Sequence, residues 1–182
     1  MSMKIIIYMA TILVSIFSVS AQSFYNYNIT TPDTVSHSLS EFAGKKIIIA
    51  ILPSNRNEDD SLYLVRLDSI FQAYSNRLII IGVASYEDGY TDDTTINTVQ
   101  WYKSILDSEI VVTQGMYTHK SSDTLQNTLF NWLTHSQQNN HYSDEVEGAG
   151  ETFFIDEQGE LYGVFGPKAR SSNKLLNKML SQ

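Results

Sequence analysis

The sequence predicts a mixed α/β domain, in which a parallel strand–helix–strand unit precedes a late antiparallel hairpin and helices flank the sheet. Two predicted strands, 46–52 and 78–84, consist of uninterrupted apolar runs apart from Lys46 and Gly82, and a helical pattern at 61–74 separates them. This order is typical of a right-handed parallel crossover whose strands are buried on both faces. A third apolar run, 152–155, is joined to 161–165 by the turn Asp156-Glu157-Gln158-Gly159, which indicates a hairpin.

Residues 1–21 are predicted to be a signal peptide and not part of the fold. Lys4 precedes an apolar run from Ile5 to Val19, and Val19-Ser20-Ala21 is a small-residue cleavage pattern. A membrane-spanning helix needs about 20 apolar residues, so we favour cleavage over an uncleaved anchor. We therefore expect an exported protein, periplasmic or secreted, whose domain occupies residues 22–182.

The composition restricts both partners and chemistry. Lys and Arg total 12 and Asp and Glu total 20, which gives a net charge of −8. Such an acidic chain is a poor partner for nucleic acid or anionic lipid, so we expect no nucleic acid and no membrane beyond the signal peptide. The sequence has no cysteine, which excludes disulfide bonds and thiol catalysis. No cofactor is expected.

The elements of the first half follow from alternation and helical spacing. Tyr25, Tyr27 and Ile29 alternate with polar residues and predict a short edge strand, closed by a turn at 31–33. After the first buried strand and a polar loop, Asp60 or Ser61 is expected to cap the next helix. That helix should pack on the sheet through Leu67, Ile70 and Phe71.

The second half contains weaker signals. Asp93 or Thr94 is expected to cap a helix that runs to Leu106, and 110–112 forms a short strand or an extended connector. Asp123 is expected to cap a helix that carries one apolar face, made by Leu125, Leu129, Trp132 and Leu133. A terminal helix is predicted from the apolar residues Leu175, Leu176, Met179 and Leu180.

Several segments together resemble the redoxin group of thioredoxin-like proteins, and within it the glutathione peroxidases. The resemblance covers Leu39 to Leu180 and includes an opening, a helix–strand pair, a late hairpin and its end. These segments are Phe42-Ala43-Gly44-Lys45-Lys46, Leu67–Tyr74 with Leu78–Val83, Thr152–Tyr162, and Phe165-Gly166-Pro167. The resemblance implies a thioredoxin-like mixed sheet flanked by helices.

The resemblance also implies a peroxidatic cysteine or selenocysteine after the first buried strand, a supporting glutamine after the next strand, and a tryptophan–asparagine pair before the late hairpin. The nucleophile position falls near Arg56 and the glutamine position near Glu87. The tryptophan–asparagine position falls on Gly148 and Ala149. All four positions hold other residues, so we expect peroxide chemistry to be lost while the scaffold is retained.

Three loops are expected to converge at one end of the sheet, because the loops after parallel strands open at the same end and the late strand enters there. These loops carry the candidate ligand-binding residues Glu58, Asp59, Asp60, Tyr86, Glu87, Asp88, Tyr90 and His141. Further acidic residues on them are Asp92, Asp93, Asp144, Glu145 and Glu147. Tyr86 and Tyr90 stand out, because large aromatic residues on loops are common at recognition surfaces.

The acidic residues admit two interpretations. They could supply oxygen ligands for a cation such as calcium, or they could cap helices and solvate loops. Their spacing matches no twelve-residue calcium loop, which favours the second interpretation, and no metal is expected. The four histidines, His37, His119, His135 and His141, also lack zinc-ligand spacing.

Three function classes therefore stay open. We expect an exported, non-catalytic binding or accessory protein that holds a protein or small ligand at the loop-bearing end of the sheet. The family resemblance implies a peroxidase or oxidoreductase instead, which the missing thiol opposes. A cation-stabilised structural domain is the third class, and calcium should then raise its melting temperature.

Overall fold

The fold is known from a computed structural model, which describes residues 23–91, 95–169 and 178–180. A five-stranded sheet forms its centre, with strand order β5-β4-β3-β6-β7. β3 (Lys46–Leu52) pairs with β4 (Leu78–Ala84) in parallel and with β6 (Thr152–Ile155) in antiparallel orientation. β7 (Leu161–Phe165) and the short β5 (Val111–Val112) form the two edges. The predicted fold class and the bounds of β3, β4, β6 and β7 are confirmed, and β5 is one residue shorter than the predicted 110–112.

The sheet is central because its inner strands are apolar on both faces. Every residue of β3 is buried, and β3 lies between β4 and β6 in register, with Ile49 opposite Ile81 on one side and Phe153 on the other. A strand with partners on both edges and cover on both faces has no polar side to expose, which explains its unbroken run of apolar residues.

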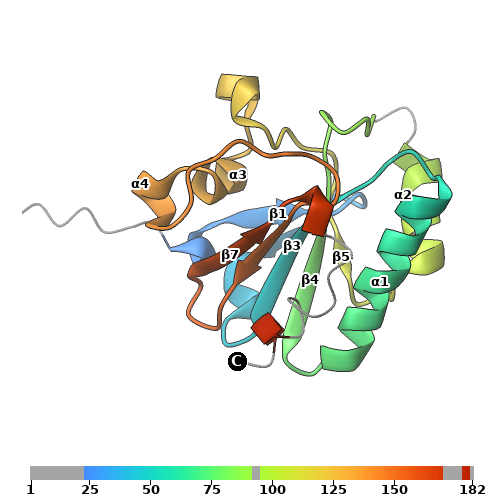
Figure 1. Ribbon diagram of the computed structural model, residues 1–182, viewed down its shortest axis with the longest axis horizontal. Helices are drawn as coiled ribbons and strands as arrows, with labels where there is room; N and C mark the ends of the chain where they lie inside the picture. Colours follow the sequence, from blue (N-terminus) through green and yellow to red (C-terminus); the bar gives the residue numbers. More distant parts are fainter. Residues whose placement is uncertain (1–22, 92–94, 170–177, 181–182) are drawn as a thin grey trace, which may run out of the picture.

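Helices cover both faces of the sheet (Figure 1). α1 (Glu58–Tyr74) and α2 (Thr95–Ile105) lie on one face, where Leu64, Leu67 and Phe71 join the core. α3 (Thr128–Leu133) and α4 (Ser136–Asn139) lie on the other. Short 3₁₀ helices complete the chain: η1 (Phe24–Asn26), η2 (Leu39–Phe42), η4 (Lys120–Leu125) and η5 (Pro167–Ala169).

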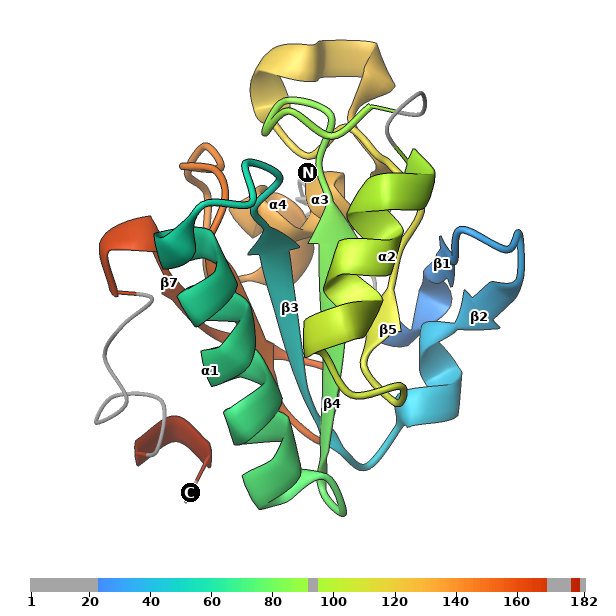
Figure 2. The same ribbon diagram turned by 90° about the vertical axis from the view of Figure 1, so that its right-hand side faces the viewer.

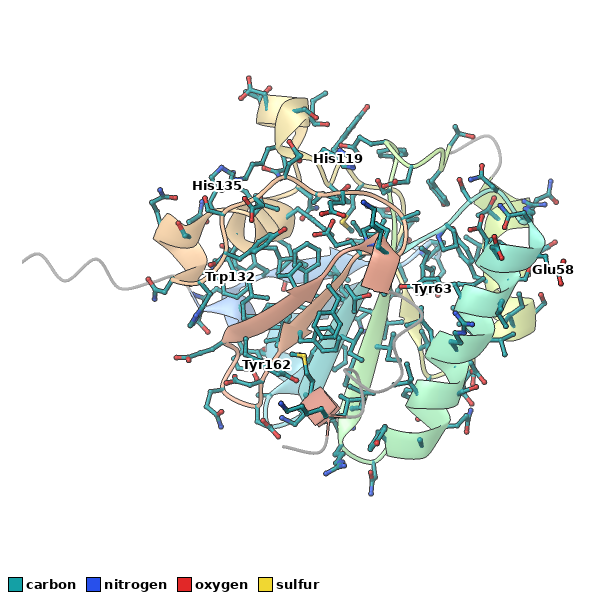
Figure 3. All side chains as sticks on the ribbon, in the orientation of Figure 1. Glu58, Tyr63, His119, Trp132, His135 and Tyr162 are labelled. Atoms are coloured by element: carbon teal, nitrogen blue, oxygen red, sulfur yellow. The ribbon has the colours of Figure 1, made fainter. Side chains whose placement is uncertain are left out.

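Both tryptophans pack against the hydrophobic core. Trp132 is buried between α3 and the sheet, where it contacts the rings of Phe24 and Tyr27. Trp101 is half-buried against the opposite core, beside Tyr102. Figure 3 shows the Trp132 side chain within the layer between α3 and the strands.

Three local predictions are wrong. The N-terminal strand is β1 (Asn28–Thr30), which pairs with β2 (Ser36–Ser38) in a separate two-stranded sheet and is not an edge of the main one. Asp60 and Ser61 do not cap α1: the helix begins earlier, because the Asn57 side chain accepts a hydrogen bond from the Asp60 N–H.

The third error concerns Asp123. It lies inside η4 with φ of 47° and caps no helix, and α3 begins instead behind Asn127, whose side chain accepts from the Leu129 N–H. Leu125 is therefore 61% exposed instead of sharing an apolar face with Leu129. A left-handed residue interrupts the helical path, and the sequence pattern had treated the whole segment as one helix.

Some predictions fall outside the described residues. These are the signal peptide (residues 1–21), Asp92, Asp93, Thr94, Leu175 and Leu176. Of the terminal helix, residues 178–180 are helical, and Leu180 is buried in the core beside α1. Within the described ranges, no helix has both the length and the apolar character needed to cross a bilayer.

Candidate functional site: the loop-bearing end of the sheet

The three loops that were expected to converge do meet at the end of the sheet where β3 and β4 finish. The Ser54 hydroxyl donates to the backbone oxygen of Asp88 at 2.6 Å. The Ala149 N–H donates to Asp88 Oδ1 at 2.8 Å, which joins the loop entering β6. Asp88 therefore links all three loops, and two of the positions that the resemblance marks, near Glu87 and at Ala149, are direct neighbours.

Gly148 has a geometric reason to be glycine. Its φ is 116°, a region that other residues rarely adopt, and a Cβ there would lie 2.7 Å from Asp88 Oδ1. A larger side chain at this position, such as the tryptophan or asparagine that the resemblance implies, would displace the Asp88 carboxylate. The hydrogen bond that links the loops through Asp88 therefore depends on a glycine at position 148, where the resemblance implies part of a tryptophan–asparagine pair.

Arg56 is exposed in the loop after β3, with φ of 55°. Its guanidinium donates to the Thr98 hydroxyl on α2 at 3.0 Å. This contact holds the arginine across the start of α1, where the resemblance implies the nucleophile. Arginine supplies a fixed positive charge and hydrogen-bond donors, but no nucleophile.

The first turn of α1 carries Glu58, Asp59 and Asp60, which stabilise the helix because carboxylates favour its positive N-terminus. Glu58 and Asp59 are exposed and Asp60 is buried. In Figure 3, Glu58 lies on the outer side of α1, far from His119 at the loop-bearing end. Glu58 thus does not join the group around Asp88.

Glu87 is held by a fourth segment that sequence reasoning missed, residues 116–122. Its carboxylate accepts hydrogen bonds from the Thr118 and His119 N–H groups at 3.1 Å and from the Ser122 and Ser85 hydroxyls. Burial opposes ionisation of Glu87, but these hydrogen bonds outweigh it and lower the pKa. The carboxylate is therefore a structural anion that orders this segment, a role that differs from the helix capping and loop solvation considered from the sequence.

His119 brings an imidazole to the same place. Its Nε2 lies 3.7 Å from Asp88 Oδ2, and both side chains are largely buried. The pair joins the fourth segment to the loop after β4. Nothing in the spacing of the four histidines indicated this contact, because the partner is an aspartate from another loop.

The tyrosines form an aromatic cluster, but with different members from those expected. Tyr90 is 2% exposed, so its prediction as a surface residue is wrong. Tyr86 is half-buried, and its ring centroid lies 6.0 Å from that of Tyr90 and 4.9 Å from that of Tyr117, which is exposed. A Cβ on Gly115 would lie 2.5 Å from the Tyr86 ring, so this glycine provides the space for the cluster.

His141 and the acidic residues around it have local partners. The His141 N–H donates to Asn139 Oδ1 at 2.8 Å, and the residue is exposed. Glu145 accepts from the N–H groups of Lys120 and Ser121 at 2.7 and 3.1 Å, which fixes the start of η4. No hydrogen bond or ion pair joins His141 to the candidates around Asp88 in the described part of the chain.

Glu151, at the entry to β6, is a buried carboxyl that sequence reasoning missed. It is 0% exposed, Oε2 accepts from the Glu147 N–H at 2.5 Å, and Oε1 accepts from the Tyr142 hydroxyl at 3.3 Å. Burial raises its pKa from the ordinary 4.5 to about 7. The negative charge of Glu147 acts in the same direction, so this group titrates near neutrality, two residues beyond Ala149.

The described residues contain no group of three or more histidine or carboxylate side chains placed to hold a metal ion. The carboxylates of Glu87, Asp88 and Glu151 point instead at N–H and O–H donors. The arrangement can order four segments and present Arg56, Tyr86 and Tyr117 at one end of the sheet.

No family model and no curated protein matches the chain. Solved structures do match its fold. The apo form of Trgpx has a TM-score of 0.63 at 16% identity, over 90% of this chain and 98% of that one. GPX1 of T. cruzi has a TM-score of 0.62 at 12% identity, over 87% of this chain and 95% of that one.

A thiol:disulfide interchange protein of the thioredoxin family from Chlorobium tepidum TLS has a TM-score of 0.58 at 14% identity, over 90% and 98% of the two chains. The protein thus has the thioredoxin-like fold found in glutathione peroxidases and redoxins, without any cysteine. At these identities the likeness concerns the fold.

Proposed function

We propose that this protein is a non-catalytic binding or accessory protein, exported from the cytoplasm, that uses a thioredoxin-like scaffold. The observation that carries the proposal is the absence of cysteine from a scaffold shared with a thiol:disulfide interchange protein. Thiolate is the nucleophile of that chemistry. Arg56, Glu87 and the Gly148-Ala149 pair occupy the positions where the resemblance implies the thiol and its supporting groups.

The contacts around Asp88 support a binding role. They hold the loops by hydrogen bonds to Ser54 and Ala149, so a ligand would meet an ordered surface and less conformational freedom would be lost on binding. We define the loop-end surface as Arg56, Tyr86 and Tyr117. Tyrosine and arginine are enriched among residues that dominate binding energies, which favours this surface for a partner protein or a small ligand.

Peroxide consumption by the purified protein tests the non-catalytic part. With hydrogen peroxide and a thiol reductant, we expect the rate to equal that of the heat-denatured protein, because no side chain can be oxidised and reduced by a thiol cycle. A rate above the denatured control would support the peroxidase alternative and contradict the proposal.

Position-specific cross-linking tests the binding part. A photoreactive amino acid replaces Tyr117 on the loop-end surface, and in a matched control it replaces Val65, which is 48% exposed on α1. We expect cross-linked adducts only when the photoreactive residue is at position 117. An excess of unlabelled wild-type protein should reduce these adducts by competing for the partner, whereas an excess of the Arg56→Glu, Tyr117→Ser double variant should not. Equal adducts at both positions, or equal competition, would contradict a site at this end.

Export is tested on the native host's fractions. The predicted signal peptide implies that protein recovered outside the cytoplasm begins at Gln22. Mass spectrometry of its N-terminal peptide checks the cleavage. Recovery of the whole chain in the cytoplasm, still carrying residues 1–21, would refute export.

A further inference from the structure

A pocket of about 580 Å³ lies at the β5 edge of the sheet, between the turn of the β1–β2 hairpin, the end of α2 and β5 itself. No residue of the loop-end surface lines it. Its apolar lining includes Val35, Leu106, Ile110 and Val112. This volume falls within the range of about 300–1,000 Å³ that is typical of ligand-binding pockets in proteins.

The backbone of β5 points hydrogen-bonding groups toward this pocket. The Thr113 N–H donates to Gly82 O on β4 at 2.9 Å, whereas the Gln114 N–H faces the other way and donates to Thr30 O at 2.8 Å. Successive residues of an extended chain alternate in this respect. The N–H and C=O of Val112, two residues before Gln114, therefore face away from β4 and toward the pocket side.

β1 reaches this edge but does not continue along it. After Thr30 the chain turns back, with the Thr31 N–H bonded to Val35 O and the Thr34 N–H bonded to Thr31 O, both at 2.9 Å. Within residues 23–91, 95–169 and 178–180, β4 is the single strand paired with β5. Figure 2 shows the β1–β2 hairpin standing beyond β5. The edge beside the pocket is thus open to a further strand.

The charged side chains at the rim of the pocket differ in whether they form hydrogen bonds or ion pairs within the protein. Asp33 accepts from the Thr31 hydroxyl, and Asp107 accepts from Gln72 Nε2 at 2.7 Å and from the Glu109 N–H at 2.9 Å. Lys103 is exposed, and no carboxylate of the described chain lies within ion-pair distance of its ammonium. The pKa of Asp33 is lowered mainly by the hydrogen bond from Thr31 and to a smaller extent by the charge of Lys103, so the two residues interact across the rim without direct contact. A carboxylate of a bound ligand could approach Lys103 more closely than Asp33 does.

We propose that this pocket binds an extended peptide segment, which adds to the β5 edge through Val112, places an apolar side chain in the pocket and pairs a carboxylate with Lys103. Strand addition of this kind draws its affinity from main-chain hydrogen bonds and its selectivity from a pocket for alternate side chains. The site is separate from the loop-end surface, and it stands or falls independently of the proposed function.

The test uses the whole protein and three acetylated hexapeptides of alternating valine and threonine. One ends in a free carboxylate, one ends in an amide, and one has a penultimate glutamate and an amide end. Binding is followed by calorimetry, and exchange of the Val112 amide hydrogen is followed by NMR. The first and third peptides each carry a carboxylate, at different places, and the second carries none. We expect at least one of the two carboxylate peptides to bind and to slow exchange of the Val112 amide, and the second peptide to bind about tenfold more weakly than the better of them.

Three variants sharpen the result. Val112→Pro removes the outward N–H while leaving the ladder to β4, and should weaken binding about tenfold. Val35→Trp fills the pocket from an exposed position and should have a similar effect, so the test survives if the proline variant fails to fold. Val65→Ser, on the outer face of α1, should bind as the wild type does.

The peptide and variant measurements distinguish a supported proposal from a refuted one. Protection of the Val112 amide together with loss of binding in Val35→Trp supports the proposal. Lys103→Glu should further abolish the preference for the carboxylate peptides. If none of the three peptides slows exchange at Val112, or if Val35→Trp binds them as tightly as the wild type does, the proposal is overturned.

Discussion

Replacement of Glu151 by glutamine should remove a pH dependence of stability that this one buried carboxyl creates. Tyr142 and the Glu147 N–H face the carboxyl, and the charge nearby is the acidic Glu147. Burial, and to a smaller extent this charge, favour the protonated form and raise the pKa to about 7. Glutamine keeps one carbonyl oxygen that can accept from the Glu147 N–H, and its NH2 group can donate to the Tyr142 oxygen. Glutamine does not titrate, so the comparison of pH profiles isolates the proton.

The sign follows from the direction of the shift. The folded state binds the proton of Glu151 more tightly than the unfolded state does, so protonation of Glu151 adds to the free energy of unfolding. This contribution is fully present below the unfolded pKa of 4.5 and is lost as pH rises through about 7. A shift of this size corresponds to about 3 kcal/mol in total. About 2.5 kcal/mol of it should be lost between pH 5 and pH 8.

Urea unfolding of the wild type and Glu151→Gln at pH 5, 6, 7 and 8 measures this difference. Other groups titrate in both proteins and cancel, so the free energy of unfolding of the wild type should fall relative to the variant by about 2.5 kcal/mol over the series. Parallel profiles would refute the reasoning, because they would mean that Glu151 is ionised in the folded protein throughout.

Three further changes have defined outcomes. Asn57→Ala removes the α1 cap and should cost about 1 kcal/mol of unfolding free energy by urea denaturation, while the control Asn55→Ala should cost nothing measurable, and equal values would exclude the cap. Gly115→Ala crowds the ring of Tyr86 and should lower stability by about 1–3 kcal/mol, and an unchanged melting temperature would show that the cluster yields without strain. Arg56→Cys, beside the acidic first turn of α1, should give a thiol whose alkylation midpoint is at or above about pH 8.5, and a midpoint below neutrality would show that activating electrostatics survive.

The main sheet could be predicted residue by residue because its strands leave strong local signals. β3 and β4 are apolar runs that must be buried on both faces, and the hairpin of β6 and β7 carries its own turn, in which the Gly159 N–H bonds to Asp156 O. Capping was less predictable, since Asn57 and Asp60 are both competent caps and the choice depends on where the loop after β3 turns into the helix.

The candidate site was predictable in its location but not in its contacts. Topology alone brings the loops of Ser54, Asp88 and Ala149 together. The partners of Glu87 could not be foreseen, because residues 116–122 have no strong periodic pattern and are fixed by long-range hydrogen bonds. Glu151 was missed for a related reason: a single acidic residue before an apolar strand looks solvent-exposed until the loop that covers it is placed.

The pairing of β3 with β6 has a consequence for biosynthesis. Ile47, Ile48 and Ile49 leave the ribosome well before their partners Phe153, Phe154 and Ile155, because α1, β4 and α2 lie between them in the chain. Closing such a long loop is slow, so the nascent protein carries an apolar strand with one open edge until β6 has been synthesised. A chain that stops before residue 152 never acquires that cover, and a premature stop between β4 and β6 would yield an aggregating fragment instead of a smaller folded protein.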